Sequence, residues 1–364
     1  MLRAHLLLLI LATVAAGCGG GDATPCTDCP DGGAGSGPDL LVDHCPGVTC
    51  GATKVCDPAT GDCICPPGTI SGAKAMCVAA AADDPSMRAQ QPVCDRWLAG
   101  HVVTDPHPFT ASSLDACDPG TLSAAGQNDA LVRLNAYRWL CGLNDNITLN
   151  PALQAQEQAC AVGVRAQGML SHQWPMDWKC YTQPGADAAA SSNESQLDRA
   201  PPAASIDQYF IESGANNYGV LGHRRWCLYP PLGPVAIGAV DDKRSMTWTC
   251  LYVFDKSGSG KATWTSYPNR GYTPLATTVM PGGTGIWSFH SRTIKVDENS
   301  KVTVKRVGDN TLLDIDVVPC TSGYADMWAI SWVPNGWTPE IDQTYRVDID
   351  NGNVIYDVKP FDCQ

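Results

Sequence analysis

Cysteine spacing is the feature that most limits what this chain can fold into. Of its 18 cysteines, six fall between Cys45 and Cys77, in a stretch with almost no apolar side chains. A segment that small gains its stability from disulfides rather than from a hydrophobic core. The chain has no pair of CxxC motifs, and no CxxC followed by HxxxH, with the ligand spacing of a zinc finger. We therefore expect disulfides and an oxidising compartment.

The first residues predict how the chain leaves the cytoplasm. Arg3 precedes an apolar run from Leu6 to Val14, which is too short to span a bilayer and is typical of an export signal. The following Ala15-Ala16-Gly17-Cys18 resembles a bacterial lipobox, whose cysteine is lipidated after cleavage. The alternative is an ordinary signal peptide in which Cys18 is incidental. We expect residues 1–17 to be a lipoprotein signal peptide, Cys18 to carry the membrane anchor, and Gly19 to favour the outer membrane or cell surface.

Composition divides the remaining chain into segments. Residues 18–44 are rich in Gly, Asp, Pro and Ser and predict a flexible tether, in which Cys26 and Cys29 can close a local disulfide. A cysteine-rich module (45–77) and a linker with lead-in (78–120) precede two larger domains, 121–267 and 268–364. The 24 basic against 37 acidic residues give a net charge of −13. Nucleic-acid binding is therefore not expected, because it requires a basic face.

Hydrophobic periodicity predicts helices first and strands later. Apolar side chains recur every three to four residues over 129–143, a second helix opens at Asn150-Pro151 and runs to Met169, and Ser205 to Gln208 forms a capping box for a third. After Pro230 the period becomes two. Strands are predicted at 235–238, 246–253, 301–305, 345–349 and 354–358, the last two joined by an Asn351-Gly352 turn. The expected fold class is α+β, with a C-terminal Ig-like β-sandwich.

The cysteine-rich module resembles an EGF-like domain in its Cys63-Ile64-Cys65 step and in the Pro-Gly that follows. The sequence alone leaves the pairing of its six cysteines open. The resemblance implies the disulfides Cys45–Cys56, Cys50–Cys63 and Cys65–Cys77. We expect a spacer or contact module.

The cysteines after the module are odd in number. We expect Cys94 to pair with Cys117, and Cys320 to pair with Cys363. One of the remaining five then stays free, pairs with the tether, or links to another chain. These five are Cys141, Cys160, Cys180, Cys227 and Cys250.

Five stretches of the helical domain have the order and spacing of a known superfamily. They are Leu134-Asn135-Ala136-Tyr137-Arg138, Leu170-Ser171-His172, Ser191-Ser192-Asn193-Glu194, the run from Tyr209 to Asn217, and the run from Gly222 to Pro230. Through them, residues 125–270 resemble the CAP superfamily, the SCP/PR-1-like domain of cysteine-rich secretory proteins. The resemblance implies a three-layer α-β-α sandwich with a cleft. That cleft contains two histidines and two acidic residues and can bind zinc or another divalent cation.

The resemblance assigns three cleft residues directly. His172 and His223 match the two histidines, and Glu212 matches an acidic position at the end of the third helix. These three are the predicted metal ligands, with zinc or another divalent cation as the cofactor.

The second acidic position belongs to a Gly-Glu-Asn motif, from which this chain departs. Aligning on Asn193 puts Ser192 in place of the glutamate and Glu194 one residue late. Because successive side chains of an extended strand point to opposite faces, Glu194 is expected to point away from the histidines. The predicted cleft residues are His172, Ser192, Asn193, Glu194, Glu212, His223 and Arg224.

Several functions are compatible with such a cleft. The first is a membrane-anchored protein whose cleft binds an extracellular lipid, peptide or glycan, or a protein partner, with a divalent metal as an optional component. The alternative is a metal-dependent hydrolase that uses His172, His223 and Glu212 as a three-ligand site open to water, which is the format of catalytic zinc. These three groups could instead hydrogen-bond one another and stiffen the cleft wall. A third possibility is a mainly structural envelope protein. The missing glutamate favours binding over turnover.

Two further groups of residues have alternative roles. Arg224 and Arg225 either grip an anionic ligand or are paired within the structure. Trp287, Trp328, Trp332 and Trp337 form either a binding surface or the core of the sandwich.

Overall fold

The structure is a computed structural model that describes residues 43–106, 108–110, 116–241, 246–280 and 283–363. The export signal, the tether, the lipidation site Cys18, and Cys26 with Cys29 lie outside the described residues. The described chain is a mixed α+β structure with several sheets, as expected. No helix within these ranges combines the length and hydropathy needed to cross a bilayer.

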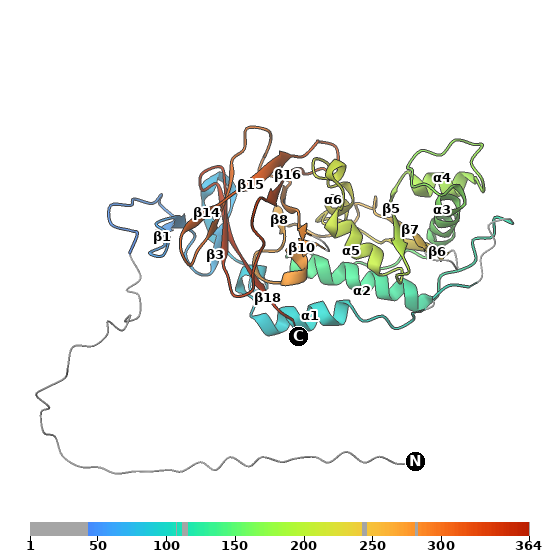
Figure 1. Ribbon diagram of the computed structural model, residues 1–364, viewed down its shortest axis with the longest axis horizontal. Helices are drawn as coiled ribbons and strands as arrows, with labels where there is room; N and C mark the ends of the chain where they lie inside the picture. Colours follow the sequence, from blue (N-terminus) through green and yellow to red (C-terminus); the bar gives the residue numbers. More distant parts are fainter. Residues whose placement is uncertain (1–42, 107, 111–115, 242–245, 281–282, 364) are drawn as a thin grey trace, which may run out of the picture. The chain divides into compact units, whose positions relative to one another are not determined.

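A three-stranded antiparallel sheet carries helices on both of its faces (Figure 1). Its strand order is β5-β7-β6, so β5 lies at an edge. The strands are β5 (Ser192–Asp198), β6 (Ala236–Asp241) and β7 (Met246–Tyr252). The helices on one face are α3 (Gln154–Gln167) and α4 (Gln183–Ala189). The helices on the other face are α2 (Ala124–Leu140), α5 (Ala204–Ile211) and α6 (Gly222–Cys227).

Strand alternation produces a separate hydrophobic core on each face of this sheet. Trp248 and Cys250 of β7 pack against α3 and α4, whereas Leu251, next in sequence, packs with α2 and α5. Successive side chains of a strand point to opposite faces, so a strand buried on both sides is apolar in nearly every position. Strand β6 is accordingly apolar from Ala236 to Val240, whereas β7 also buries two threonines, Thr247 and Thr249.

The three helices predicted from periodicity are present, with different starts. Helix α2 begins earlier, because the Ser123 side chain accepts a hydrogen bond from the Gly126 amide and caps it. Helix α3 begins at Gln154, because Asn150 instead closes a turn by accepting from the Ala152 amide. The predicted capping box at Ser205 is wrong: Ser205 lies inside α5 and donates to the Pro202 carbonyl.

The C-terminal part consists of two sheets with a shared core. The first has the order β15-β16-β12-β8 and the second β14-β13-β17-β18-β9. Side chains from both sheets, including Trp287, Trp332 and Val347, form the core between them. Trp287 and Trp332 are therefore core residues and not a binding surface. Strand β8 belongs to this sandwich, although the predicted boundary placed it in the preceding domain.

The strands of the sandwich are β8 (Trp264–Tyr267), β9 (Gly271–Pro274), β12 (Trp287–Ser291), β13 (Val302–Arg306), β14 (Thr311–Leu313), β15 (Ile315–Pro319), β16 (Trp328–Pro334), β17 (Tyr345–Ile349) and β18 (Val354–Phe361). A short hairpin, β10 (Val279–Met280) with β11 (Gly283–Thr284), precedes β12. The predicted hairpin of β17 and β18 is confirmed. Its turn residues Asp350, Asn351 and Gly352 all have positive φ, the conformation in which Asn and Gly are most easily accommodated.

The cysteine-rich module has the three disulfides that the EGF-like pattern implied: Cys45–Cys56, Cys50–Cys63 and Cys65–Cys77. Its strands are β1 (Val55–Cys56), β2 (Cys63–Ile64), β3 (Thr69–Ser71) and β4 (Cys77–Ala79).

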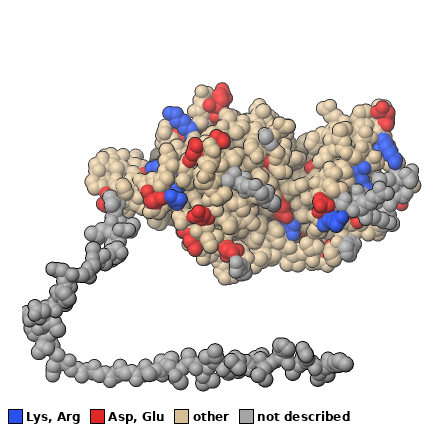
Figure 2. Space-filling model, in the orientation of Figure 1, with Lys and Arg blue, Asp and Glu red and all other residues tan. Residues whose placement is uncertain are grey.

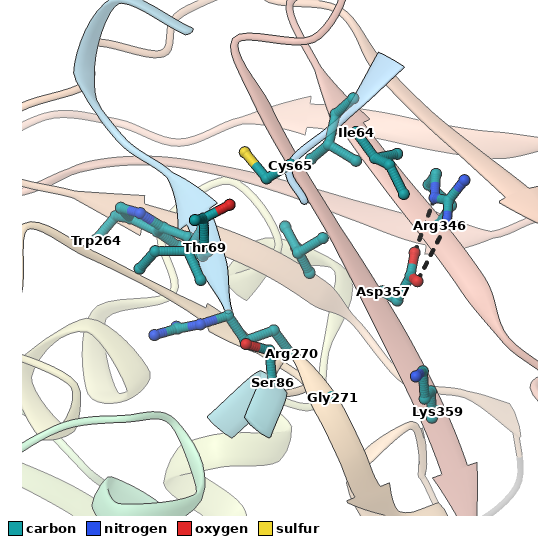
Figure 3. A pocket seen from close by; sticks show the side chains of 13 residues that line it. Ile64, Cys65, Thr69, Ser86, Trp264, Arg270, Gly271, Arg346, Asp357 and Lys359 are labelled. Carbon is teal, nitrogen blue, oxygen red and sulfur yellow. Dashed lines mark hydrogen bonds and ion pairs between the residues drawn. The ribbon is translucent and has the colours of Figure 1, made fainter. Parts of the chain in front are cut away.

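The module is packed against the sandwich. Arg346 of β17 bonds to Asp57 of the module and to Asp357 of β18, and the Trp264 indole donates to the Ser71 carbonyl at 3.0 Å. Side chains of both parts line a cavity of about 150 Å³ at this junction (Figure 3). The module therefore makes specific contacts with the sandwich rather than serving only as a spacer.

Long-range disulfides correct the predicted pairing outside the module. Cys94 pairs with Cys363 and not with Cys117, and Cys320 forms no disulfide. The remaining bridges are Cys117–Cys180 and Cys160–Cys250. Within the described chain, three cysteines are thus unpaired where one was expected: Cys141, Cys227 and Cys320.

The segment predicted as linker and lead-in contains a helix, α1 (Gln90–Gly100), which carries Cys94. Helix α1 packs closely on α2, because Gly100 has no side chain: a Cβ there would lie 2.4 Å from that of Ala136. The Cys94–Cys363 bridge ties α1 to the end of the sandwich. Helix α1, which lies in the segment predicted as a linker, is therefore part of the folded structure.

Charged side chains follow two patterns. Acidic and basic side chains are interspersed on the face seen in Figure 2, with broad uncharged areas between them. Three arginines, Arg138, Arg224 and Arg225, are instead fully buried. Arg138 donates to the carbonyls of Asn144, Cys227, Tyr229 and Pro230, so main-chain oxygens replace its water.

Candidate functional site

The candidate site lies at the start of the edge strand β5, where four segments meet. His172 follows α3, Glu194 lies on β5, Glu212 ends α5, and His223 is the second residue of α6. Glu212 adopts a left-handed conformation (φ 51°, ψ 48°), which ends α5. All the predicted cleft residues except Arg224 line the cavities at this edge.

His172 forms the first histidine–glutamate pair. Its Nδ1 lies 2.8 Å from the Ala189 carbonyl and 4.0 Å from Glu194 Oε1. Because a carbonyl only accepts, Nδ1 carries the proton, and the neutral ring then has its acceptor at Nε2. The imidazole is about half exposed, whereas the Glu194 side chain is buried.

His223 forms the second pair, with Glu212. Nδ1 of His223 donates to Glu212 Oε2 at 3.0 Å, and the Arg224 amide donates to Glu212 Oε1 at 2.9 Å. Burial lowers the pKa of His223, but the charge and hydrogen bond of Glu212 outweigh that effect and raise it above its usual value. Glu212 thus fixes the ring orientation of His223, and both of its oxygens accept hydrogen bonds from the chain.

The predicted orientation of Glu194 is wrong. Ser192 and Glu194 share one face of β5: Ser192 donates to Glu157 of α3 at 2.7 Å, and Glu194 lies beside His172. Asn193 points the other way and donates to the His223 carbonyl at 3.1 Å. The prediction treated Glu194 as one residue out of phase, but Glu194 lies two residues after Ser192, the position matched to the glutamate, so a period of two places both side chains on the same face. The cleft therefore has two carboxylates and not one.

Glu194 is buried without adequate partners. Neither carboxylate oxygen makes a hydrogen bond of ordinary geometry to a described residue. Burial raises the pKa of Glu194 to about 7, against smaller lowering effects of the Ser171 amide and His223. Unsatisfied buried carboxylates are costly, and such groups cluster at functional sites.

Glu157 is a second buried carboxylate, which the sequence reasoning missed. Burial raises its pKa to about 8; the Ser192 hydroxyl lowers it, and nearby Glu194 raises it. It lies at helical spacing from Cys160 and Val164 on the buried face of α3. An acidic residue within an apolar stripe is the signal that could have identified it.

The predicted three-ligand metal site does not assemble in this geometry. Among the described residues, the only group of three potential ligand atoms within 4.8 Å of one another belongs to Cys160, Glu194 and Cys250, and the two cysteines are joined in a disulfide. The oxygens of Glu212 are already engaged. Each histidine, however, has its Nδ1 bonded to an oxygen acceptor, which is how metal-binding imidazoles are usually oriented. Both imidazoles line one cavity.

Arg224 does not face the cleft. It is fully buried, and its guanidinium donates to the carbonyls of Phe210 and Ile286 and to the Ser288 hydroxyl. Arg225 likewise donates to main-chain carbonyls, those of Thr321 and Met327. Both arginines join α6 to the sandwich and are not available to an anionic ligand.

The cleft has two lobes that share Glu212, Asn217 and His223. The polar lobe, about 250 Å³, is lined by hydroxyl and amide side chains that include Ser195, Gln196 and Gln208. The aromatic lobe, about 310 Å³, adds His172 and the rings of Trp226, Phe254 and Tyr324. Each volume lies near the lower end of the range of small-molecule pockets.

Comparisons with known proteins give no family for this chain. No family model matches it, and neither does a curated protein or a solved structure.

Proposed function

We propose that this protein is an exported lipoprotein, anchored through Cys18, whose cleft at the β5 edge binds an extracellular ligand. The export signal and lipobox-like sequence support the anchoring. We also propose that residues 125–270 form a CAP-like domain. The helices on both faces of a three-stranded sheet, and the cleft containing two histidines and two glutamates, support that assignment.

The observation that carries the binding proposal is the pair of oriented imidazoles. His172 and His223 each have Nδ1 held by an oxygen, so that Nε2 is the acceptor or ligand atom of each ring. The buried Glu194 carboxylate near His172 adds a charge that lacks adequate partners. A polar or cationic group would compensate it.

A divalent cation is a candidate component of this cleft. His172 and His223 are the residues that would hold it through Nε2, and the Ala189 carbonyl and Glu212 would orient the two rings. When bound, zinc would supply a Lewis acid for an oxygen of the ligand. A site with two protein ligands is expected to bind zinc more weakly than a closed structural site, in which the protein supplies all the ligands.

The expected alternative, a metal-dependent hydrolase, is less well supported by this geometry. It needs Glu212 as a third ligand, and both Glu212 oxygens accept hydrogen bonds within the protein. We therefore propose binding rather than turnover.

Isothermal titration calorimetry with Zn²⁺ tests the cleft directly. We expect the purified chain to bind one equivalent, and His172→Ala and His223→Ala each to weaken or abolish binding. His44→Ala, which removes an exposed histidine just before the cysteine-rich module, is the matched control and should bind as the unmodified chain does. Unchanged affinity in the His172→Ala/His223→Ala double variant would remove the proposed metal site.

A further inference from the structure

The aromatic lobe exposes two ring faces beside the histidines. Phe254 is 40% and Tyr324 is 36% exposed, whereas Trp226 is largely buried beneath Phe254, with ring centroids 4.3 Å apart. Most aromatic side chains of this chain lie in its cores, as Tyr209 and Phe289 do. Exposed rings lining a concavity are typical of ligand contacts.

Tyr324 reaches the cleft from the sandwich. It lies in residues 321–327, between β15 and β16, here called the Tyr324 segment. Ala325 and Met327 of this segment are buried in the helix-side core, and buried Arg225 donates to the carbonyls of Thr321 and Met327 at its two ends. The cleft is therefore built from both large domains.

Two residues of the Tyr324 segment have a strained backbone conformation. Ala325 (φ 51°) and Asp326 (φ 47°) are both left-handed non-glycine residues, which are strained by about 1 kcal/mol or more each. Asp326 is retained by Lys256 at 2.6 Å and by the Tyr229 hydroxyl at 3.3 Å. Strain of this kind persists where the surrounding structure fixes it, and it is common at ligand-binding sites.

Gly222 gives the Tyr324 ring its place beside His223. A Cβ at Gly222 would lie 3.1 Å from Tyr324 Cε1, so a larger residue would displace the ring. The ring is thereby positioned next to the first turn of α6, which carries His223.

The polar side chains that line the aromatic lobe are uncharged, apart from Glu212 and the two histidines, His172 and His223. This polar lining consists of hydroxyl, amide and imidazole groups, with Glu212 as its one carboxylate, already bonded to His223 and to the Arg224 amide. Apart from the aromatic rings, the polar side chains of this lining are those of Ser192, Asn193, Asn217, His172, His223 and Glu212. Flat apolar faces beside neutral hydrogen-bonding groups complement a sugar ring, which has an apolar face and hydroxyls at its rim.

We propose that the aromatic lobe binds the apolar face of a neutral sugar ring against Tyr324 and Phe254, so that the ligand of the cleft is a glycan. This inference rests on the proposed binding function. The lobe, of about 310 Å³, has room for a sugar ring, and the polar lobe beyond His223 accepts the hydroxyls of the next. An acyl chain fits less well, because it would cover the Nε2 acceptors of His172 and His223 without offering them a hydrogen-bond donor.

Saturation-transfer NMR and calorimetry test the proposal with defined probes. The probes are β-1,4-linked tetramers of N-acetylglucosamine and of glucose and an α-1,4-linked glucose tetramer, with palmitate and an uncharged aromatic hexapeptide as competitors. We expect at least one saccharide to bind with a Kd of about 1 mM or tighter. Tyr324→Ala should weaken it about 3- to 10-fold, which corresponds to one lost ring contact.

Two variants control for folding and position. Tyr324→Phe keeps the ring and should retain affinity within about twofold. Trp328→Ala removes a similarly exposed aromatic side chain that does not line the cleft, and it should leave binding unchanged. If no saccharide binds, if Tyr324→Ala binds as the unmodified chain does, or if only palmitate or the peptide binds, the glycan proposal is wrong. Zn²⁺ binding separates the two proposals: if it persists in the unmodified chain without saccharide binding, only the glycan inference fails.

Discussion

Replacing Glu194 with glutamine should stabilise the protein at alkaline pH. The folded state raises the pKa of Glu194 from its ordinary 4.5 to about 7, chiefly through burial. Below pH 4.5 the carboxyl is protonated in both the folded and unfolded states, so it makes no difference to stability. Between pH 4.5 and 7 the unfolded state loses this proton while the folded state keeps it, and the free energy of unfolding falls.

The size of the effect follows from the shift in pKa. A shift of about 2.5 units at about 1.4 kcal/mol per unit gives roughly 3 kcal/mol, fully developed above pH 7. Glutamine has nearly the same shape and no charge, so Glu194→Gln lacks this pH-dependent loss. It also removes the charge that raises the pKa of Glu157.

Urea denaturation with intact disulfides and a chelator present, at pH 4.5, 6, 7 and 8, measures the difference in stability between variant and unmodified chain. We expect that difference to grow by about 3 kcal/mol in favour of Glu194→Gln from the lowest to the highest pH. Glu298→Gln, at an exposed position, is the matched control. An offset that is the same at pH 4.5 and pH 8 would refute the reasoning, because it would show that Glu194 titrates alike in the folded and unfolded states.

Three further perturbations test other parts of the structure. Arg224→Met leaves the carbonyls that its guanidinium satisfies without donors, and should lower the free energy of unfolding by about 3 kcal/mol or more, whereas Arg199→Met at an exposed site should change it little; equal effects in urea melts would contradict the structural role of Arg224. Removing the Cys94–Cys363 bridge by a double serine substitution opens a loop of 269 residues and should cost about 2–5 kcal/mol; an unchanged melt would show that α1 is held without it. Cys18→Ser should move the exported protein from the detergent phase to the aqueous phase in Triton X-114 partitioning; retention in the detergent phase would exclude Cys18 as the sole anchor.

Local sequence signals predicted local structure well. The hairpin of β17 and β18 followed from alternation and an Asn-Gly turn, and the three module disulfides followed from spacing that resembles an EGF-like domain. In the hairpin the interacting residues lie close in sequence, so few alternatives compete, whereas the module pairing was implied by the resemblance and not by the cysteine positions alone. The start of α3 was misplaced by three residues, because Asn150 is as well suited to a turn as to a helix cap.

Features that depend on distant parts of the chain were not predictable in this way. The Cys94–Cys363 bridge joins residues that lie 269 positions apart, and nothing in the local spacing distinguishes it from Cys94 with Cys117. Arg224 looked available for an anion because its carbonyl partners come from α5 and from near β12. Tyr324 carries no local signal, because it meets the cleft only through the packing of residues 321–327 against α6.

The orientation of Glu194 depended on a single reference residue. Alternation along an extended strand is reliable, but it has to be counted from Ser192, the position matched to the glutamate, which is two residues from Glu194 and therefore on the same face. Counting from Asn193 inverted the prediction for Glu194. The sequence therefore identified both histidines and Glu212, yet described the cleft as lacking the carboxylate that the structure places beside His172.

Histidine ring NMR during a Zn²⁺ titration tests the central claim most directly, because it reports which imidazoles bind. We expect the ring signals of His172 and His223 to move together while those of His44 and His101 stay in place. Because Glu212 raises the pKa of His223, protons should compete increasingly as the pH falls through that pKa, so binding weakens in acid. Signals of His172 and His223 that do not respond at neutral pH, or that respond no more than those of His44 and His101, would contradict the account of this cleft.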